Sequence, residues 1–330
     1  MRRAAVILGV LAAFPVAAQM KGPSFDCAKA QSAIDRTICK DADLSKADRA
    51  LVAAYTALLD RLKGAERDGV VKSQGRWVTS RNRVCQQREP DGIADCLKDR
   101  YAQRTATLQS MAVAPFVMVD EQTLTARGRF GKVGWSYDIA FLRFEAKGVD
   151  FAAVNTRYAN DALKSAQDAT PSDLSDIDDE RTWEYQSSFA IERPPGGRLA
   201  AVVQQFYGYS GGAHGYGATI CSAVDLKTGK FLSPSSVFGP EPWQRPLYQL
   251  VVADIRRQFK EREGFEDSLK PESMNKMLSE SARYCWLPKH LEIVFNAYDV
   301  GPYAAGPYYV DIPYERLKPM LRPDGPITLR

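Results

Sequence analysis

Six cysteines constrain the fold of this 330-residue chain more than any other feature. They follow a segment in which Arg2 and Arg3 precede an apolar run that ends in small residues at 16–18, the pattern of a cleavable signal peptide. In the oxidising compartment that such a peptide leads to, an even number of cysteines predicts disulfide bonds. The cysteines are Cys27, Cys39, Cys85, Cys96, Cys221 and Cys285.

The apolar run at the N-terminus has about 15 residues, whereas a helix that spans a bilayer needs roughly 20. No second apolar run of that length follows in the sequence. We therefore expect residues 1–18 to be removed, and the mature chain to be periplasmic or secreted without a transmembrane anchor.

A metal centre is not expected from the sequence. The cysteines lack Cys-x-x-Cys spacing and the chain has two histidines, so the usual zinc ligands are scarce. The acidic run at 173–180 lacks the alternating ligands and the central glycine of an EF-hand loop. We expect neither a metal nor another cofactor.

Residues 24–110 have the pattern of a helical module. Apolar residues recur at three- and four-residue steps, as on the buried face of a helix. These positions are Leu44, Leu51, Tyr55, Leu58 and Leu62 in the first helix, Val70 and Trp77 in the second, and Leu97, Tyr101 and Leu108 in the third.

The pairing of the first four cysteines depends on the shape of residues 28–38. If these residues form one helix, Cys27 and Cys39 lie about 18 Å apart, which is too far for a bridge. The favoured pairing is then Cys27 with Cys96 and Cys39 with Cys85. The alternative, Cys27 with Cys39 and Cys85 with Cys96, requires a bent first segment.

Residues 24–110 carry a series of motifs in a fixed order, which are Ser24-Phe25-Asp26-Cys27, Ile38-Cys39-Lys40-Asp41, Tyr55, Gln74, Trp77, Arg81, Cys85 and Cys96-Leu97. In order and spacing they resemble the LprI family of lysozyme inhibitors. The resemblance implies a small helical module with four cysteines. We interpret Trp77 and Arg81 as a structural motif, because a tryptophan on a buried stripe is usually part of the core.

The remainder of the chain predicts an α+β domain at 130–322, after a linker at 111–129. Strands alternate in polarity, which favours a mainly antiparallel sheet with packed helices. The strands are expected at 137–145, 183–191, 199–207, 216–226, 291–299 and 308–314, and the helices at 151–169, at 243–259 and from 271. The expected fold class is therefore α+β with two domains, the first all-α and disulfide-bonded.

The glycine-rich stretch at 206–217 matches the G-x-S-x-G pattern of a hydrolase elbow, with Ser210 at its centre between Gly208 and Gly212. An elbow requires a helix directly after the serine, whereas here an alternating strand is predicted. His290 is the single late histidine that could serve such a serine. We expect no catalytic residues and no enzyme.

Two further motifs are Tyr209-Ser210-Gly211-Gly212-Ala213-His214-Gly215 and Pro302-Tyr303-Ala304-Ala305-Gly306-Pro307. They resemble the extracellular domain of the RsiV anti-sigma factor, which binds lysozyme. The resemblance makes Gly211, Gly212 and Gly215 a structural turn that faces the second motif. Candidate partner contacts are Tyr209, His214, Tyr216 and Tyr303, and Cys221 and Cys285 are expected to form a bridge.

The charges are unevenly distributed. Residues 19–110 hold 17 Lys and Arg against 12 Asp and Glu, and residues 111–330 hold 25 against 28. No basic stripe interleaved with aromatic residues is present, so nucleic acid is not expected as a partner. The leading hypothesis is an exported protein that binds and inhibits lysozyme, and the alternative is a cell-envelope or peptidoglycan-binding protein without inhibitory activity.

Overall fold

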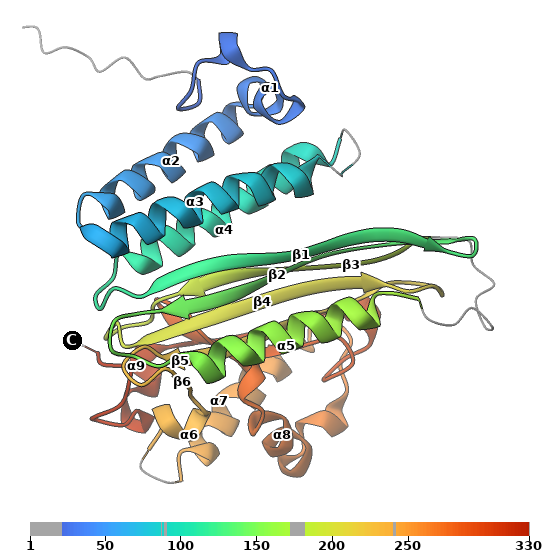
Figure 1. Ribbon diagram of the computed structural model, residues 1–330. Coiled ribbons are helices and arrows are strands. Elements are labelled where there is room, and N and C mark those ends of the chain that lie inside the picture. Colours follow the sequence, from blue (N-terminus) through green and yellow to red (C-terminus); the bar gives the residue numbers. More distant parts are fainter. Residues whose placement is uncertain (1–21, 87, 89–90, 172–181, 240–241, 330) are drawn as a thin grey trace, which may run out of the picture.

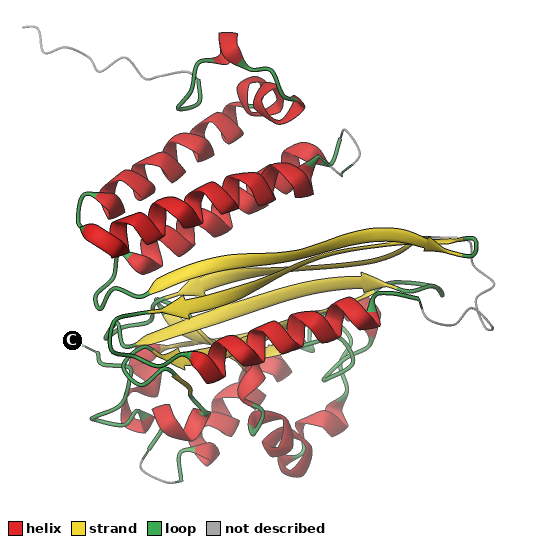
Figure 2. Cartoon of the chain, viewed as in Figure 1, coloured by secondary structure: helices red, strands yellow, loops and turns green. Residues whose placement is uncertain are grey.

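Figure 1 shows the computed structural model of the chain, which describes residues 22–86, 88, 91–171, 182–239 and 242–329. The expected signal peptide and the acidic run at 173–180 lie outside the described residues. A layer of helices lies on one side of a long sheet, and helix α5 and the C-terminal elements lie on the other side in this view (Figures 1 and 2). In the part of the chain that is described, no helix is long and apolar enough to cross a membrane.

The N-terminal layer is helical, as predicted. Asp41 caps α2 through bonds from the backbone N–H groups of Asp43 and Leu44, and Ser32 forms a capping box with Asp35 at the start of α1. The elements are η1 (Cys27–Lys29), α1 (Ala33–Lys40), α2 (Ala42–Leu59), α3 (Gly64–Cys85) and α4 (Ile93–Met111).

The favoured cysteine pairing is wrong, and the alternative is present. Cys27 bonds to Cys39 with the Cα atoms 5.9 Å apart, and Cys85 bonds to Cys96 with the Cα atoms 5.6 Å apart. The prediction failed because residues 28–38 do not form one helix. The 3-10 turn η1 ends at Lys29 and the chain bends before Ser32, which returns Cys27 to the end of α1.

The main sheet is ordered β1-β2-β3-β4-β5-β6. The pairing of β2 with β3 is parallel and the chain crosses between them through α5, while the other neighbours among these strands pair antiparallel. The bounds are β1 (Met118–Phe130), β2 (Val133–Glu145), α5 (Ala152–Asp168), β3 (Trp183–Glu192), β4 (Leu199–Tyr209), β5 (Tyr216–Asp225) and β6 (Lys230–Phe231). The α+β fold class with a helical N-terminal region is confirmed.

The linker expected at 111–129 is wrong. Helix α4 runs to Met111, and β1 begins at Met118 and forms a long hairpin with β2. Strand β1 was missed because its charged residues interrupt the apolar alternation that marks a strand. Two of these residues, Asp120 and Glu121, pair with arginines of α3 and α4.

The C-terminal elements form a second, smaller sheet with short helices. The sheet is ordered β7-β8-β9 and antiparallel, and the expected bridge from Cys221 to Cys285 joins β5 to β7. The bounds are α6 (Pro234–Val237), α7 (Gln244–Gln258), α8 (Pro271–Leu278), β7 (Tyr284–Trp286), β8 (His290–Phe295), β9 (Tyr308–Pro313) and α9 (Tyr314–Leu317), with 3-10 turns η2 (Glu266–Leu269), η3 (Ser281–Arg283), η4 (Tyr303–Ala305) and η5 (Lys318–Met320).

One continuous apolar core joins the helical layer to the main sheet. It includes Leu58 and Leu108 of the helices, Val119 and Leu142 of the sheet, and Val154 of α5. The helical region is therefore packed onto the sheet and is not a separate unit on a tether.

Arginines of α3 and α4 fix the contact between the helices and the sheet. Arg100 forms ion pairs with Glu121 at 3.0 Å and with Asp138 at 2.8 Å, and all three side chains are largely buried. Arg76 pairs with Asp120 at 2.7 Å from a more exposed position. Two of the basic residues of the helical layer are thus directed into this contact.

Candidate functional site

A cleft of about 790 Å³ opens where the helical layer, the main sheet and the C-terminal elements meet. Each of the three parts contributes side chains to its wall. The helical layer contributes Arg88, from the loop between α3 and α4, and Asp99, Arg100 and Gln103 of α4. The sheet contributes Asp138, Gln186, Ser188, Gln205, Tyr207 and Thr219, and the C-terminal part contributes Asn296, Tyr303 and Tyr309.

The helical wall of the cleft is held by buried polar contacts. Arg88 donates to the Gln186 side-chain oxygen at 2.6 Å, and Arg100 holds Asp138. Burial raises the pKa of Asp138, and Arg100 acts in the opposite direction. The wall is therefore a fixed polar surface in which these charges already have partners.

The opposite wall is tied to β5 by Asn296. Its side-chain oxygen accepts from the Thr219 N–H at 2.9 Å, and its amide nitrogen donates to the Thr219 carbonyl at 3.0 Å. This pair of bonds imitates one step of a strand ladder. It fixes the segment after β8 at the edge of the cleft.

The glycine-rich turn at 206–217 and the segment 302–307 meet at the cleft, as expected from the sequence. The Tyr303 hydroxyl donates to the Gly215 carbonyl at 2.9 Å, and its ring stacks on His214 with the centroids 4.0 Å apart. An imidazole nitrogen of His214 also lies 2.7 Å from the same carbonyl. Two of the predicted contact residues therefore form one rigid pair.

Backbone shape accounts for three glycines of this turn. Gly211 and Gly212 have φ of 95° and 86°, which side chains rarely adopt. A Cβ on Gly215 would lie 2.4 Å from the Tyr207 hydroxyl oxygen. Glycine at 215 thus lets the Tyr207 ring lie across the turn.

Three tyrosines present exposed rings at the cleft. The exposed fractions are 43% for Tyr207, 36% for Tyr303 and 38% for Tyr309. Large aromatic side chains among amides and hydroxyls combine apolar contact area with hydrogen bonding, a combination found at interface hot spots. The cleft can therefore hold a polar segment of a partner.

The predicted contact residues do not all lie at the cleft. Tyr216 is exposed, but its ring packs beside Phe206, whose side chain points to the face opposite Tyr207. Tyr209 is half-buried at the turn, where its hydroxyl donates to the Gly212 carbonyl at 3.1 Å. Tyr207 and Tyr309 were not predicted as contact residues, although the alternation of β4 and β9 places both on the less buried face of their strands.

Trp77 and Arg81 lie away from the cleft, in a buried network between α2, α3 and α4. Arg81 lies over the Trp77 and Tyr101 rings and donates to the Tyr101 hydroxyl at 2.8 Å. Tyr101 in turn donates to Asp48 at 2.9 Å. Burial raises the pKa of Tyr101, so its hydroxyl keeps the proton that it donates.

Ser210 lies in an exposed turn, and the next regular element is strand β5. The helix that a nucleophile elbow requires does not follow it. His290 is on β8, in the smaller sheet.

Family models match two separate parts of the chain. A family model described as "Lysozyme inhibitor LprI" matches residues 27–108, and one described as "Protein of unknown function (DUF3298)" matches residues 235–315. The LprI resemblance is therefore confirmed. The chain carries an LprI lysozyme-inhibitor domain and a DUF3298 domain.

Individual relatives are distant. An uncharacterised protein of Rhizobium meliloti (strain 1021) is 26% identical over 133 residues, which cover 34% of this chain and 96% of that protein. A DUF3298 family protein of known structure from Pseudomonas aeruginosa PAO1 is 16% identical, with a TM-score of 0.45 over 64% of this chain and 98% of its own. Another from Bacteroides fragilis NCTC 9343 is 17% identical, with a TM-score of 0.41 over 64% of this chain and 94% of its own.

Proposed function

We propose that this protein is an exported, non-enzymatic binding protein whose cleft takes a segment of a lysozyme-type muramidase. The observation that carries the proposal is the shared wall of the cleft. Arg100 and Gln103 come from the LprI domain, and Asn296, Tyr303 and Tyr309 come from the DUF3298 domain. A ligand in the cleft would touch both domains at once.

The partner class follows from the LprI domain, which supports lysozyme-inhibitor-like binding in general. The resemblance of residues 130–322 to the lysozyme-binding domain of RsiV gives a second reason for the same class. Disulfides at both ends of the chain suit an oxidising compartment outside the cytoplasm. Binding that covers the substrate cleft of the muramidase would then protect the cell wall.

Substitution of the cleft tyrosines tests this proposal. We expect Tyr207→Ala and Tyr309→Ala each to weaken binding of a c-type lysozyme about thirtyfold, or roughly 2 kcal/mol. The reason is that both rings would become buried on binding, and tyrosines buried at interface hot spots contribute at least this much. Isothermal titration calorimetry of the mature chain measures the change, and a lysozyme activity assay measures inhibition.

Tyr216→Ala is the matched control, because Tyr216 is as exposed as Tyr207 but lies on the opposite face of the sheet. We expect it to change the affinity less than about threefold. An equal loss in all three variants would contradict binding at the cleft. Absence of binding at micromolar concentrations would contradict the partner class.

A second candidate function is peptidoglycan binding without inhibition. It is favoured by the amide and tyrosine lining of the cleft, because Gln186, Gln205 and Asn296 can bond sugar hydroxyls while aromatic rings stack on sugar faces. Sedimentation of the protein with purified sacculi, together with unchanged lysozyme activity, would favour this function over the first.

A further inference from the structure

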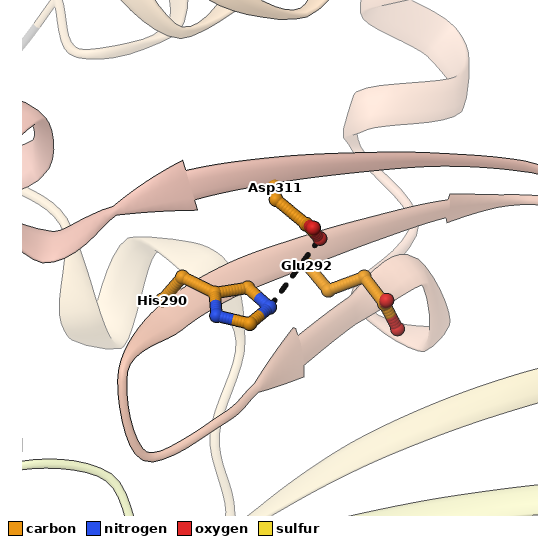
Figure 3. A group of neighbouring side chains, drawn as sticks. All are labelled: His290, Glu292 and Asp311. Carbon is orange, nitrogen blue, oxygen red and sulfur yellow. Dashed lines mark ion pairs between the residues drawn. The ribbon is translucent and has the colours of Figure 1, made fainter.

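One face of the smaller sheet, the same face that bears Cys285, carries three potential metal ligands from two neighbouring strands. His290 and Glu292 are two residues apart on β8, so their side chains leave the same face, and Asp311 on β9 is the register partner of Glu292. Figure 3 shows the three side chains together, with His290 directed toward Asp311. One ligand atom from each lies within 4.8 Å of the others.

The distance between the His290 Nε2 and Asp311 Oδ1 atoms is 3.3 Å. A charge-assisted hydrogen bond between such groups is normally about 2.7 to 2.9 Å. Two ligands bound tetrahedrally at about 2.0 to 2.1 Å from Zn²⁺ are roughly 3.3 to 3.4 Å apart. The spacing is compatible with shared coordination of a cation as well as with the ion pair between the two side chains.

Charge also favours a cation at this position. Glu292 and Asp311 lie directly opposite each other on paired strands, an arrangement in which like charges destabilise a sheet. A divalent cation between them would replace this repulsion with attraction. One imidazole nitrogen with two carboxylate oxygens is a ligand set typical of zinc, whereas calcium and magnesium take oxygen ligands.

We propose that His290, Glu292 and Asp311 form a zinc site with a coordination position open to solvent. Three protein ligands leave a fourth position for water or an added ligand. The strands hold the ligands on a rigid platform, because Glu292 is also the register partner of Cys285, which is bonded to Cys221. Tyr309 lies on the same side of β9, about 7 Å along the strand from Asp311, and it lines the cleft, so the site adjoins the end of the cleft.

Titration with Zn²⁺ tests the site in the mature chain without a polyhistidine tag. We expect one Zn²⁺ per chain by calorimetry and a higher midpoint of thermal unfolding in its presence. His290→Ala and Asp311→Asn should each weaken binding at least about tenfold, since even loss of a residue that supports a zinc ligand has an effect of this size. Asp311→Asn keeps the side-chain shape, so a loss of binding does not reflect misfolding.

His214→Ala is the matched control, because it removes the other histidine of the chain. It should leave the stoichiometry and the affinity for Zn²⁺ unchanged. Binding that survives in His290→Ala, binding that is lost in His214→Ala, or tighter binding of Ca²⁺ than of Zn²⁺ would each overturn the proposal. The lysozyme assay is not required, so this test stands apart from the proposed function.

Discussion

Arg100→Ala should lower the free energy of unfolding by about 3 to 5 kcal/mol, the range for removal of one partner from a buried ion pair. Arg100 binds both Glu121 and Asp138, whose side chains are 11% and 14% exposed. Without the guanidinium, two carboxylates would remain at the contact between the helices and the sheet. The variant should therefore loosen the contact that unites the two halves of the core.

The loss of stability in the Arg100→Ala variant should depend on pH. Burial raises the pKa of Glu121 above its ordinary value of 4.5 and that of Asp138 above 3.8, and Arg100 opposes both shifts. In the variant both pKa values rise further. Between the pKa of these carboxylates in the unfolded chain and their higher pKa in the native state, the unfolded chain loses protons that the native state retains, so native stability falls as the pH increases. This pH interval is wider in the variant than in the wild type. The difference from the wild type should be larger at pH 8 than at pH 5.

Urea denaturation at the two pH values measures this difference. Arg157→Ala is the control, because Arg157 forms an exposed pair with Asp161 within α5, and it should cost no more than about 0.5 kcal/mol. A wild-type midpoint for Arg100→Ala, or a loss that is the same at both pH values, would show that the buried carboxylates do not govern this contact.

Trp77→Ala should also cost about 3 to 5 kcal/mol, because it leaves a cavity in the helical core. The Trp77 side chain is 2% exposed and meets the Tyr101 ring edge to face at 5.8 Å. Its loss would also remove one of the two rings beneath Arg81. Urea denaturation measures the stability, and calorimetry with lysozyme measures the affinity of the folded variant.

Val71→Ala is the matched control on the same helix, since Val71 is 44% exposed, and its effect should stay within about 0.5 kcal/mol. We expect the folded Trp77→Ala variant to bind lysozyme with unchanged affinity, because Trp77 lies outside the cleft. A stable variant with reduced affinity would instead assign Trp77 to partner binding.

Local patterns were sufficient to predict the long helices. The spacing of Leu44, Leu51 and Leu58 marks one face of α2, and all three side chains are buried. The cysteine pairing was not predictable in the same way, because it depends on the break between η1 and α1. Three non-helical residues there changed the distance between Cys27 and Cys39 from a predicted 18 Å to 5.9 Å.

Strand β1 was not predicted, because its charged side chains form ion pairs with another part of the chain. Asp120 and Glu121 are charged in the sequence but largely buried in the fold, where arginines of α3 and α4 meet them. If charged residues are assumed to lie at the surface, the sequence of such a strand is interpreted as a linker. Recognition of β1 would have required knowledge of where the helices dock.

The candidate site was predicted in part, for a related reason. His214 and Tyr303 were identified from motifs, and they do form a stacked pair. Tyr207 and Tyr309 belong to strands without a distinctive motif, and the cleft that unites them depends on packing among three parts of the chain. The ligands of the proposed zinc site were missed because Asp311 reaches His290 through strand pairing.

The position of β1 at an edge of the main sheet affects the tendency of the chain to aggregate during folding. It is the outer strand of the main sheet, and a long outer strand can add a strand from a second molecule. Asp120 and Glu121 find their arginine partners after α3 and α4 have docked. Until then their charges oppose strand addition, because inserting them into a foreign sheet would desolvate them without partners. We therefore expect the carboxylates that anchor the helices also to oppose association of chains in which the helices have not yet docked.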